Sequence, residues 1–222
     1  MKQYRLQDLL EIMEQLRAGC PWDKEQTYES LKRYVIEEAY EVVDAVDEPD
    51  RMCLADELGD LLLQVVFYAQ LGKEDGSFSM EDVLRCVCEK MIRRHPHVFG
   101  TVKAETSEEV LTNWAQIKKQ EKGQKTLTQT LEGVSVSLPA LMRAQKVQDS
   151  AVKAGAWEEE GYGLIKEAEH FSHAKTPHER EEALGRLLFA AVLEGRRAGV
   201  QPETALQQET GRFIREMGQK SE

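Results

Sequence analysis

Apolar residues recur every three or four positions along most of this sequence, and that spacing places them on one face of an α-helix. The first segment shows the pattern clearly, with apolar residues at Leu6, Leu9, Leu10, Met13 and Leu16. Gly19 and Pro21 end that segment, because glycine and proline both interrupt helices. The same spacing continues almost to the end of the chain, so the sequence predicts an all-α fold.

Breaks in the periodic pattern define the other predicted helices. These are expected at residues 28–47, 50–71, 80–94, 107–119, 138–153, 163–174, 177–198 and 201–217. Thr27 and Ser79 are the expected N-caps of two of them. Residues 122–137 are polar with little apolar periodicity, and we interpret them as a linker. We therefore expect a first domain at residues 1–121 and a second at residues 138–222.

The charge and composition argue against several classes of partner. The 222 residues carry a formal net charge of −11, whereas duplex DNA and anionic membranes require a basic surface. The longest apolar run, Leu61–Leu71, is interrupted by Gln64 and Gln70 and is too short to span a bilayer. The amphipathic N-terminus contains acidic residues and does not resemble a signal peptide. Four cysteines without CxxC spacing indicate reduced thiols, so we expect a cytoplasmic protein with no nucleic-acid or membrane partner.

Carboxylates lie beside the apolar face of two consecutive predicted helices. On a helical wheel, Glu38 and Glu41 fall at the edge of the apolar stripe of the helix at residues 28–47. Glu57 and Asp60 flank the stripe of the next helix in the same way. Residues three positions apart are neighbours on a helix surface, so each helix offers a pair of carboxylates at the margin of the core.

These four carboxylates repel one another and need compensation. Each like-charged pair costs about 0.2–0.5 kcal/mol in a helix, and more where the local dielectric constant is low. Protonation of one carboxyl group would reduce the repulsion, and a divalent cation would reduce it further. Ligation by oxygen alone favours Mg²⁺ or Mn²⁺, and the lack of a histidine at ExxH spacing disfavours a di-iron centre. The alternative is a solvated acidic face, which suits Asp44, Asp47 and Glu48 better than these four.

Two later helices carry cationic and aromatic residues that suit an anionic ligand. Lys90 and Arg94 lie four residues apart, and so do Trp114 and Lys118. Lysine and arginine bind phosphate, and an indole stacks on a base. On the residues alone, a solvated lysine and a core tryptophan are the more common explanations. The chain has no GxxxxGKS or GxxxxGKT loop and no Ser or Cys beside a base at convincing spacing, which disfavours a P-loop enzyme and a covalent nucleophile.

The motif EEAYE at residues 37–41, followed by ELGD at residues 57–60, matches the EExxE…ExxD pattern of the MazG family of nucleoside triphosphate pyrophosphohydrolases. Further blocks resemble bacterial MazG sequences in the expected order. They are GCPWDKEQTYESL, DLLLQVVFYAQ, RRHPHVFG, VLTNWAQIKKQEK and SLPALMRAQKVQ. The resemblance covers about residues 5–155. Each acidic motif alone is weakly specific, whereas the ordered set is highly specific.

The resemblance implies a MazG-like helical bundle that is completed by dimerisation. It also implies Mg²⁺-dependent hydrolysis of NTPs and dNTPs to the nucleoside monophosphate and pyrophosphate, a house-cleaning activity. By motif position, Glu38, Glu41, Glu57 and Asp60 would be the metal ligands. Glu37 would support the ligands or orient water, which agrees with its place furthest from the apolar stripe. Glu37, Glu38 and Glu41 are therefore the expected catalytic residues.

The resemblance also implies nucleotide-binding roles. The expected substrate-binding residues are Lys90, Arg94, Trp114, Lys118, Trp22 and Lys24, the last two for the base or ribose. Two alternatives stay open at this point. One is a narrower enzyme of the same superfamily, such as a dUTPase, a dCTPase or a phosphoribosyl-ATP pyrophosphatase. The other is a non-catalytic helical scaffold that senses nucleotides.

The second half of the chain looks like a degenerate copy of the first, although two unrelated bundles are an alternative. ALGRLLFAAV resembles ELGDLLLQVV, and KEAEH at residues 166–170 stands where EEAYE is expected. In this copy His170, Ala183 and Arg186 replace acids, whereas two-domain MazG proteins keep both acidic motifs in the second half. We therefore expect no catalytic metal there, with Arg186 supplying a fixed positive charge in its place. The expected role of this half is dimerisation or scaffolding.

Overall fold

A computed structural model describes residues 3–104, 106–121, 126–157 and 161–220, without the side chains of residues 111, 115, 116 and 118–120. Within those ranges all regular secondary structure is helical, which confirms the predicted all-α fold. The chain divides into two compact units, unit 1 at Met1–Lys118 and unit 2 at Lys119–Glu222. No helix in the described ranges is both long enough and apolar enough to cross a bilayer.

The helices follow the predicted order closely. They are α1 (Leu6–Gly19), α2 (Pro21–Glu25), α3 (Tyr28–Ala45), α4 (Arg51–Asp75), α5 (Met80–Arg94), α6 (Pro96–Phe99), α7 (Ser107–Glu121), α8 (Leu127–Glu132), α9 (Ala140–Lys153), α10 (Leu164–His173), α11 (Pro177–Arg197) and α12 (Pro202–Gln219). The one-turn helices α2 and α6 lie where loops were expected, and each begins with a proline whose fixed φ suits a first helical position. Helix α8 lies inside the segment that we interpreted as a linker.

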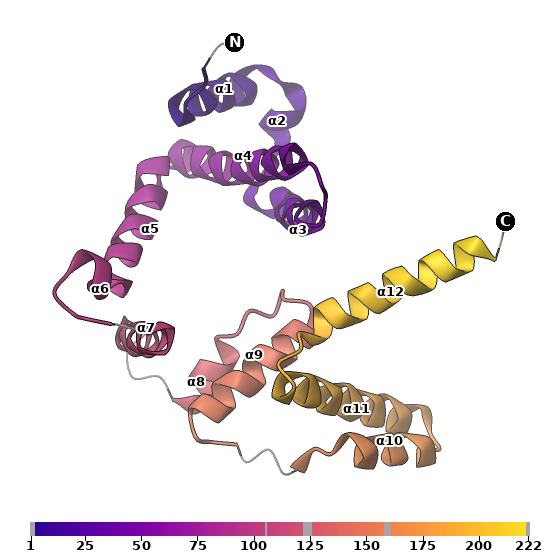
Figure 1. Ribbon diagram of the computed structural model, residues 1–222. Helices are drawn as coiled ribbons and strands as arrows, with labels where there is room; N and C mark the ends of the chain where they lie inside the picture. The colour runs from indigo at the N-terminus through magenta and orange to yellow at the C-terminus, as the bar shows by residue number, and fades with distance from the viewer. Residues whose placement is uncertain (1–2, 105, 122–125, 158–160, 221–222) are drawn as a thin grey trace. The chain divides into compact units, whose positions relative to one another are not determined.

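Unit 1 is organised around α4, which packs between α1 and α3 (Figure 1). The buried core of this unit consists of Met13, Leu31, Val66, Phe67 and Leu71. Met13 and Leu31 belong to the apolar stripes read from the sequence, and they reach α4 from opposite sides. Full burial of each such side chain contributes roughly 1.5–3 kcal/mol. This packing holds α3 alongside α4, and those two helices carry the acidic motifs.

Helix α4 is longer than the sequence suggested, because Gly72 does not end it. The helix continues to Asp75 and ends at Gly76, whose φ of 73° lies in the left-handed region that favours glycine. Gly72 instead allows the Phe78 ring to approach the helix closely. A Cβ atom on Gly72 would lie 2.7 Å from that ring, which is closer than real Cβ contacts.

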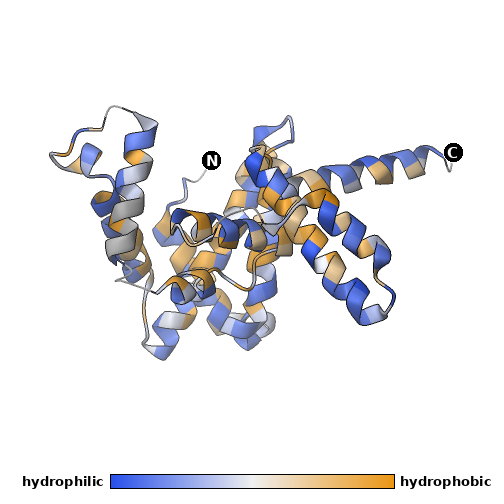
Figure 2. Ribbon diagram, turned by 90° about the horizontal axis from the view of Figure 1, so that it is seen from below, coloured by the Kyte–Doolittle hydropathy of each residue, from blue (hydrophilic) through white to orange (hydrophobic). Residues whose placement is uncertain are grey.

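Part of each predicted core face stays open in the single chain. Val43, Val46 and Leu58 are 56%, 50% and 48% exposed, and Leu62 and Val65 are exposed as well. Figure 2 shows hydrophobic and hydrophilic residues interleaved along the helices. All five belong to the apolar stripes beside which the carboxylates were placed, and a helical wheel predicts that such stripes are buried. For these five residues that prediction is wrong in the isolated chain. The reason is geometric, since the contacts of α3 and α4 with each other and with α1 cover only part of each apolar stripe.

Unit 2 is a smaller bundle in which α11 packs against α9, α10 and α12. Its buried residues include Ala183, Ala190, Val192 and Leu193 of α11. Helices α10 and α11 run alongside each other in opposite directions (Figure 1). Glu167 of α10 is an ionisable residue among the buried positions, with 1% of its surface exposed.

Candidate active site

The acidic motifs of unit 1 lie on the facing sides of α3 and α4. Thr27 caps α3 by accepting a hydrogen bond from the Ser30 backbone N–H, as the sequence predicted. Asp50 caps α4 by accepting one from the Met52 N–H. Well-defined helix starts and the packed core between the helices determine which way each carboxylate points.

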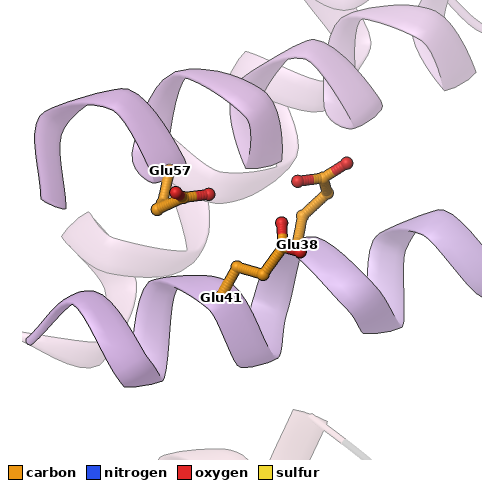
Figure 3. A group of neighbouring side chains, drawn as sticks. All are labelled: Glu38, Glu41 and Glu57. Carbon is orange, nitrogen blue, oxygen red and sulfur yellow. The ribbon is translucent and has the colours of Figure 1, made fainter. Parts of the chain in front are cut away.

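Three glutamates converge between the two helices. Glu38 and Glu41 extend from α3, and Glu57 extends from α4 toward them (Figure 3). Each offers a carboxylate oxygen, and these oxygens all lie within 4.8 Å of one another. Glu38 and Glu57 are half-buried, whereas Glu41 is exposed. Three of the four carboxylates in the two predicted pairs therefore lie close together across the interface between α3 and α4.

Burial and neighbouring negative charges raise the pKa of two of these carboxyl groups. For Glu38 burial is the largest cause, followed by the charges of Asp60 and Glu41. For Glu57 burial again comes first, followed by the charges of Glu41 and Asp60. A raised pKa means that the folded chain disfavours the ionised forms, so the site favours a bound cation or a proton.

Asp60 and Glu37 lie at the margin of this cluster. Asp60 is exposed one turn beyond Glu57 on α4, and it does not belong to the three-glutamate group. Its charge nevertheless raises the pKa of Glu38, so it lies near enough to act on the site. Glu37 is exposed on α3, as its place on the wheel suggested.

The donor set suits a hard divalent cation. Carboxylate oxygens alone are the ligands that Mg²⁺ and Mn²⁺ prefer. The three glutamates each offer an oxygen within 4.8 Å of the others, so they would together hold such an ion. The raised pKa of Glu38 and Glu57 has the same cause, the gathering of partly buried carboxylates, and agrees with a site for positive charge.

The predicted base-binding residues Trp22 and Lys24 lie on the one-turn helix α2, and both are exposed. The Trp22 ring meets the Tyr34 ring edge to face, with 5.9 Å between centroids. This contact leaves half of the indole surface open. The α2 segment therefore presents an aromatic face and a lysine to solvent.

Arg17, which the sequence did not single out, lies beside the α2 segment that carries Trp22 and Lys24. Its guanidinium donates hydrogen bonds to the backbone carbonyls of Asp23 and Gln26, and to the Glu74 carboxylate on α4. It thus ties α2 to α1 and α4. Its only sequence signal is a basic residue in the last turn of a helix, which is too common to be informative.

The predicted phosphate- and base-binding pair on α5 and α7 interact with each other. The Arg94 guanidinium lies over the Trp114 ring, with 5.3 Å from its central carbon to the ring centroid. Cation–π packing of this kind orients both groups. Lys90 is half-buried on α5. Lys118 lies on α7, but its side chain is outside the described residues.

The family model for the MazG nucleotide pyrophosphohydrolase domain matches residues 26–99, which include the whole three-glutamate cluster. Known members also align with nearly the whole chain, and this chain belongs to the MazG nucleotide pyrophosphohydrolase family.

Three relatives show how far the similarity extends. A Thermotoga maritima protein described as nucleoside triphosphate pyrophosphohydrolase/pyrophosphatase MazG is 45% identical over 214 residues, 94% of this chain and 82% of that protein. The nucleoside triphosphate pyrophosphohydrolase of Escherichia coli K12 is 44% identical over 219 residues, 93% of this chain and 83% of that protein. Its Mycobacterium tuberculosis counterpart is 41% identical over 154 residues, 68% of this chain and 46% of that protein.

Proposed function

We propose that this protein hydrolyses nucleoside triphosphates, both NTPs and dNTPs, to the nucleoside monophosphate and pyrophosphate with the help of Mg²⁺ or Mn²⁺. The observation that carries the proposal is the convergence of Glu38, Glu41 and Glu57. The names of the relatives support the reaction, and the oxygen-only donor set supports the metal. Such an enzyme would act on the cytoplasmic nucleotide pool.

The chain supplies a cluster of carboxylates that would bind the metal for this reaction. Glu38, Glu41 and Glu57 would hold the cation, with Asp60 as the fourth carboxylate at its edge. When bound, Mg²⁺ neutralises phosphate charge and makes a coordinated water more acidic. Water adds to the α-phosphorus, and the bond from that phosphorus to the bridging oxygen breaks. Pyrophosphate leaves with the bonding electrons, and the proton of the water passes to a carboxylate, for which Glu37 is our candidate.

Residues of α2, α5 and α7 would position the nucleotide. Trp22 offers an open aromatic face for a base, and Lys24 lies two residues further along the same segment. Arg94 and Trp114 form one oriented unit, so we assign them a joint role at the phosphates or base. Lys90 and Lys118 would add positive charge for a triphosphate.

We further propose that the enzyme is a homodimer through the open apolar faces of α3 and α4. Exposed residues of these two helices include Ile36, Tyr40, Val43, Leu58 and Leu62. Exposed apolar clusters on soluble folds usually mark interaction sites. A second copy would cover them and would lower the dielectric constant around the adjacent carboxylates, which strengthens metal binding.

The test is pyrophosphate release from the eight common NTPs and dNTPs, with and without Mg²⁺. We expect Mg²⁺-dependent release by the native protein and none by Glu38→Gln. Glu48→Gln is the matched control, because Glu48 is an exposed acid outside the cluster. Thermal unfolding of both variants verifies that they fold.

Each other outcome has a definite meaning. Release from one nucleotide alone would favour the narrower enzyme. Nucleotide binding without any release would favour the sensing scaffold and would contradict the proposal. Equal loss of release in both variants would contradict the assignment of the site to this cluster.

A further inference from the structure

Glu167 in unit 2 is a buried charge that the proposed reaction does not use. It lies on α10 with 1% of its surface exposed. It occupies the second position of KEAEH, which corresponds to Glu38 in EEAYE. Burial of a carboxylate is strongly unfavourable unless a partner compensates its charge.

Arg186 of α11 is that partner, and its geometry is bidentate. Its Nε donates to Oε2 of Glu167 at 2.9 Å, and its Nη2 donates to Oε1 at 3.1 Å. The guanidinium also lies over the Tyr162 ring, 5.4 Å from the ring centroid. In such a bidentate pair, each carboxylate oxygen accepts a hydrogen bond, and the two parallel hydrogen bonds fix the orientation of the guanidinium. Arg186 stands in ALGR at the position of Asp60 in ELGD.

The other positions of the unit 2 set do not fit a hard divalent cation. His170 stands where Glu41 would be and Ala183 where Glu57 would be, so only one carboxylate of the four remains. The pocket beside Glu167 is lined by Lys166, Glu167, Glu169, His170, His173 and Arg186. Positive charge from side chains has thus replaced the negative charge that a cation site requires.

The two equivalent glutamates have opposite neighbours. Glu38 lies in a group of three carboxylates whose oxygens are within 4.8 Å of one another. Glu167 instead accepts two hydrogen bonds from the Arg186 guanidinium, and these hydrogen bonds lower the pKa of the Glu167 carboxyl group. The helix pair of unit 2 therefore contains a positive charge at the position where the helix pair of unit 1 has only acids.

We propose that Arg186 is a built-in cation that takes the place of the divalent metal in unit 2, so that α10 and α11 stay assembled without any metal. Unit 2 is then a metal-independent support, and Mg²⁺ acts on unit 1 alone. The comparison between the two units rests on the proposed function, because it assumes the metal site of unit 1. The effect of Arg186 on the stability of unit 2 can be measured whether or not unit 1 binds a metal.

The first test removes the Arg186 guanidinium from the 222-residue chain. Arg186→Ala removes both guanidinium hydrogen bonds from the buried Glu167 and leaves the His170 ring, whose Nδ1 lies 3.8 Å from Oε2, as a weaker partner. We expect the unfolding midpoint of unit 2 to fall by about 10 °C or more. Hydrogen exchange of α10 and α11 peptides assigns the loss to unit 2, and added Mg²⁺ is not expected to restore it. Arg212→Ala is the matched control, because Arg212 pairs with Glu209 at an exposed site on α12 and its loss should change the midpoint little.

A second variant covers the case in which Arg186→Ala does not fold. Glu167→Leu with Arg186→Leu removes both charges, and we expect it to regain most of the stability that the single substitution loses. An Arg186→Ala protein as stable as the native one would overturn the proposal. So would rescue of Arg186→Ala by Mg²⁺ to the native midpoint.

The third test asks whether unit 2 binds metal. Mn²⁺ binding is measured in Glu38→Gln, Glu57→Gln protein, which keeps the native unit 2 residues, and we expect none. In the same background, His170→Glu, Ala183→Glu and Arg186→Asp together restore four carboxylates, and we expect Mn²⁺ binding to return. Mn²⁺ bound in the first protein and lost on adding Glu167→Gln would overturn the proposal. Absence of pyrophosphate release by the native protein would contradict the proposed function and would leave these stability results unaffected.

Discussion

Arg17 at the end of α1 binds Glu74 near the end of α4, with 3.0 Å between Nε and Oε1 and 2.5 Å between Nη2 and Oε2. The same guanidinium also donates to carbonyl oxygens of the α2 segment. The Arg17 side chain therefore holds the α2 segment beside α4, and the contact between the Trp22 and Tyr34 rings joins the same segment to α3. Lysine could not replace Arg17, because an ammonium group cannot make these directed contacts together.

We predict that Arg17→Ala raises KM for nucleotides by about tenfold and changes kcat by less than about threefold, because roughly 1.4 kcal/mol of lost positioning corresponds to a factor of ten. Steady-state pyrophosphate release measures both constants. Arg85→Ala is the control, since Arg85 pairs with Asp82 at an exposed position on α5. An unchanged KM in Arg17→Ala would show that α2 does not contact substrate.

The raised pKa of Glu38 and Glu57 predicts how Mg²⁺ and pH act together. A carboxyl group whose pKa is higher in the folded chain than in the unfolded chain stabilises the fold at low pH. This stabilisation is complete below the pKa of the unfolded chain, near 4.5, and is lost as the pH rises through the pKa of the folded chain. Metal-free unit 1 should therefore be less stable at pH 7.5 than at pH 5. Mg²⁺ at 100 times its Kd should add about 2.7 kcal/mol at pH 7.5 and less at pH 5.

Thermal unfolding at both pH values, with EDTA or with Mg²⁺, measures this coupling. Glu48→Gln should behave as the native protein does, and Glu38→Gln should lose most of the Mg²⁺ response. Equal stabilisation by Mg²⁺ at both pH values would show that metal and protons do not compete for these carboxylates.

Gly72→Ala tests the packing that the sequence did not indicate. The new methyl group would collide with the Phe78 ring, so we expect a loss of about 1–3 kcal/mol despite the better helix propensity of alanine. Gly185→Ala is the matched helical control, because nothing lies within 4 Å of its added Cβ, and it should stabilise by up to about 1 kcal/mol. Urea unfolding measures both. A Gly72→Ala protein as stable as Gly185→Ala would mean that Phe78 moves aside at little cost.

The exposed apolar face of α3 predicts a dimer interface, and a single charged residue introduced there should dissociate the dimer. Val43→Asp would place a carboxylate in the proposed interface, so we expect light scattering to show a monomer and activity to fall at least about tenfold. Val102→Asp is the control, because Val102 is similarly exposed outside α3 and α4. A native protein that is monomeric while active would contradict the proposed dimer.

Much of the fold follows from local patterns in the sequence. The 3.6-residue period identifies each long helix and its buried stripe, because helix formation and the choice of buried face depend on neighbours along the chain. Caps such as Thr27 identify helix starts for the same reason. The acids of EEAYE and ELGD were also recognisable, since a motif is a property of the sequence alone.

Other features depend on contacts between distant segments. The periodicity of apolar residues did not predict three contacts. These are the packing of the Phe78 ring against Gly72, the hydrogen bonds from Arg17 to the α2 segment, and the stacking of Arg94 over the Trp114 ring. The same periodicity predicted burial for the outer half of the α3 and α4 stripes, because a wheel shows which face is apolar and not what covers it.

The sequence by itself determined the long helices, the family and the candidate carboxylates of this protein. Only the tertiary structure decided that Glu38, Glu41 and Glu57 converge while Asp60 stays at the margin, and that Arg186 satisfies Glu167. The physical reason is that distances across a helix interface depend on packing angle and side-chain rotamers, which the side chains between the helices set together.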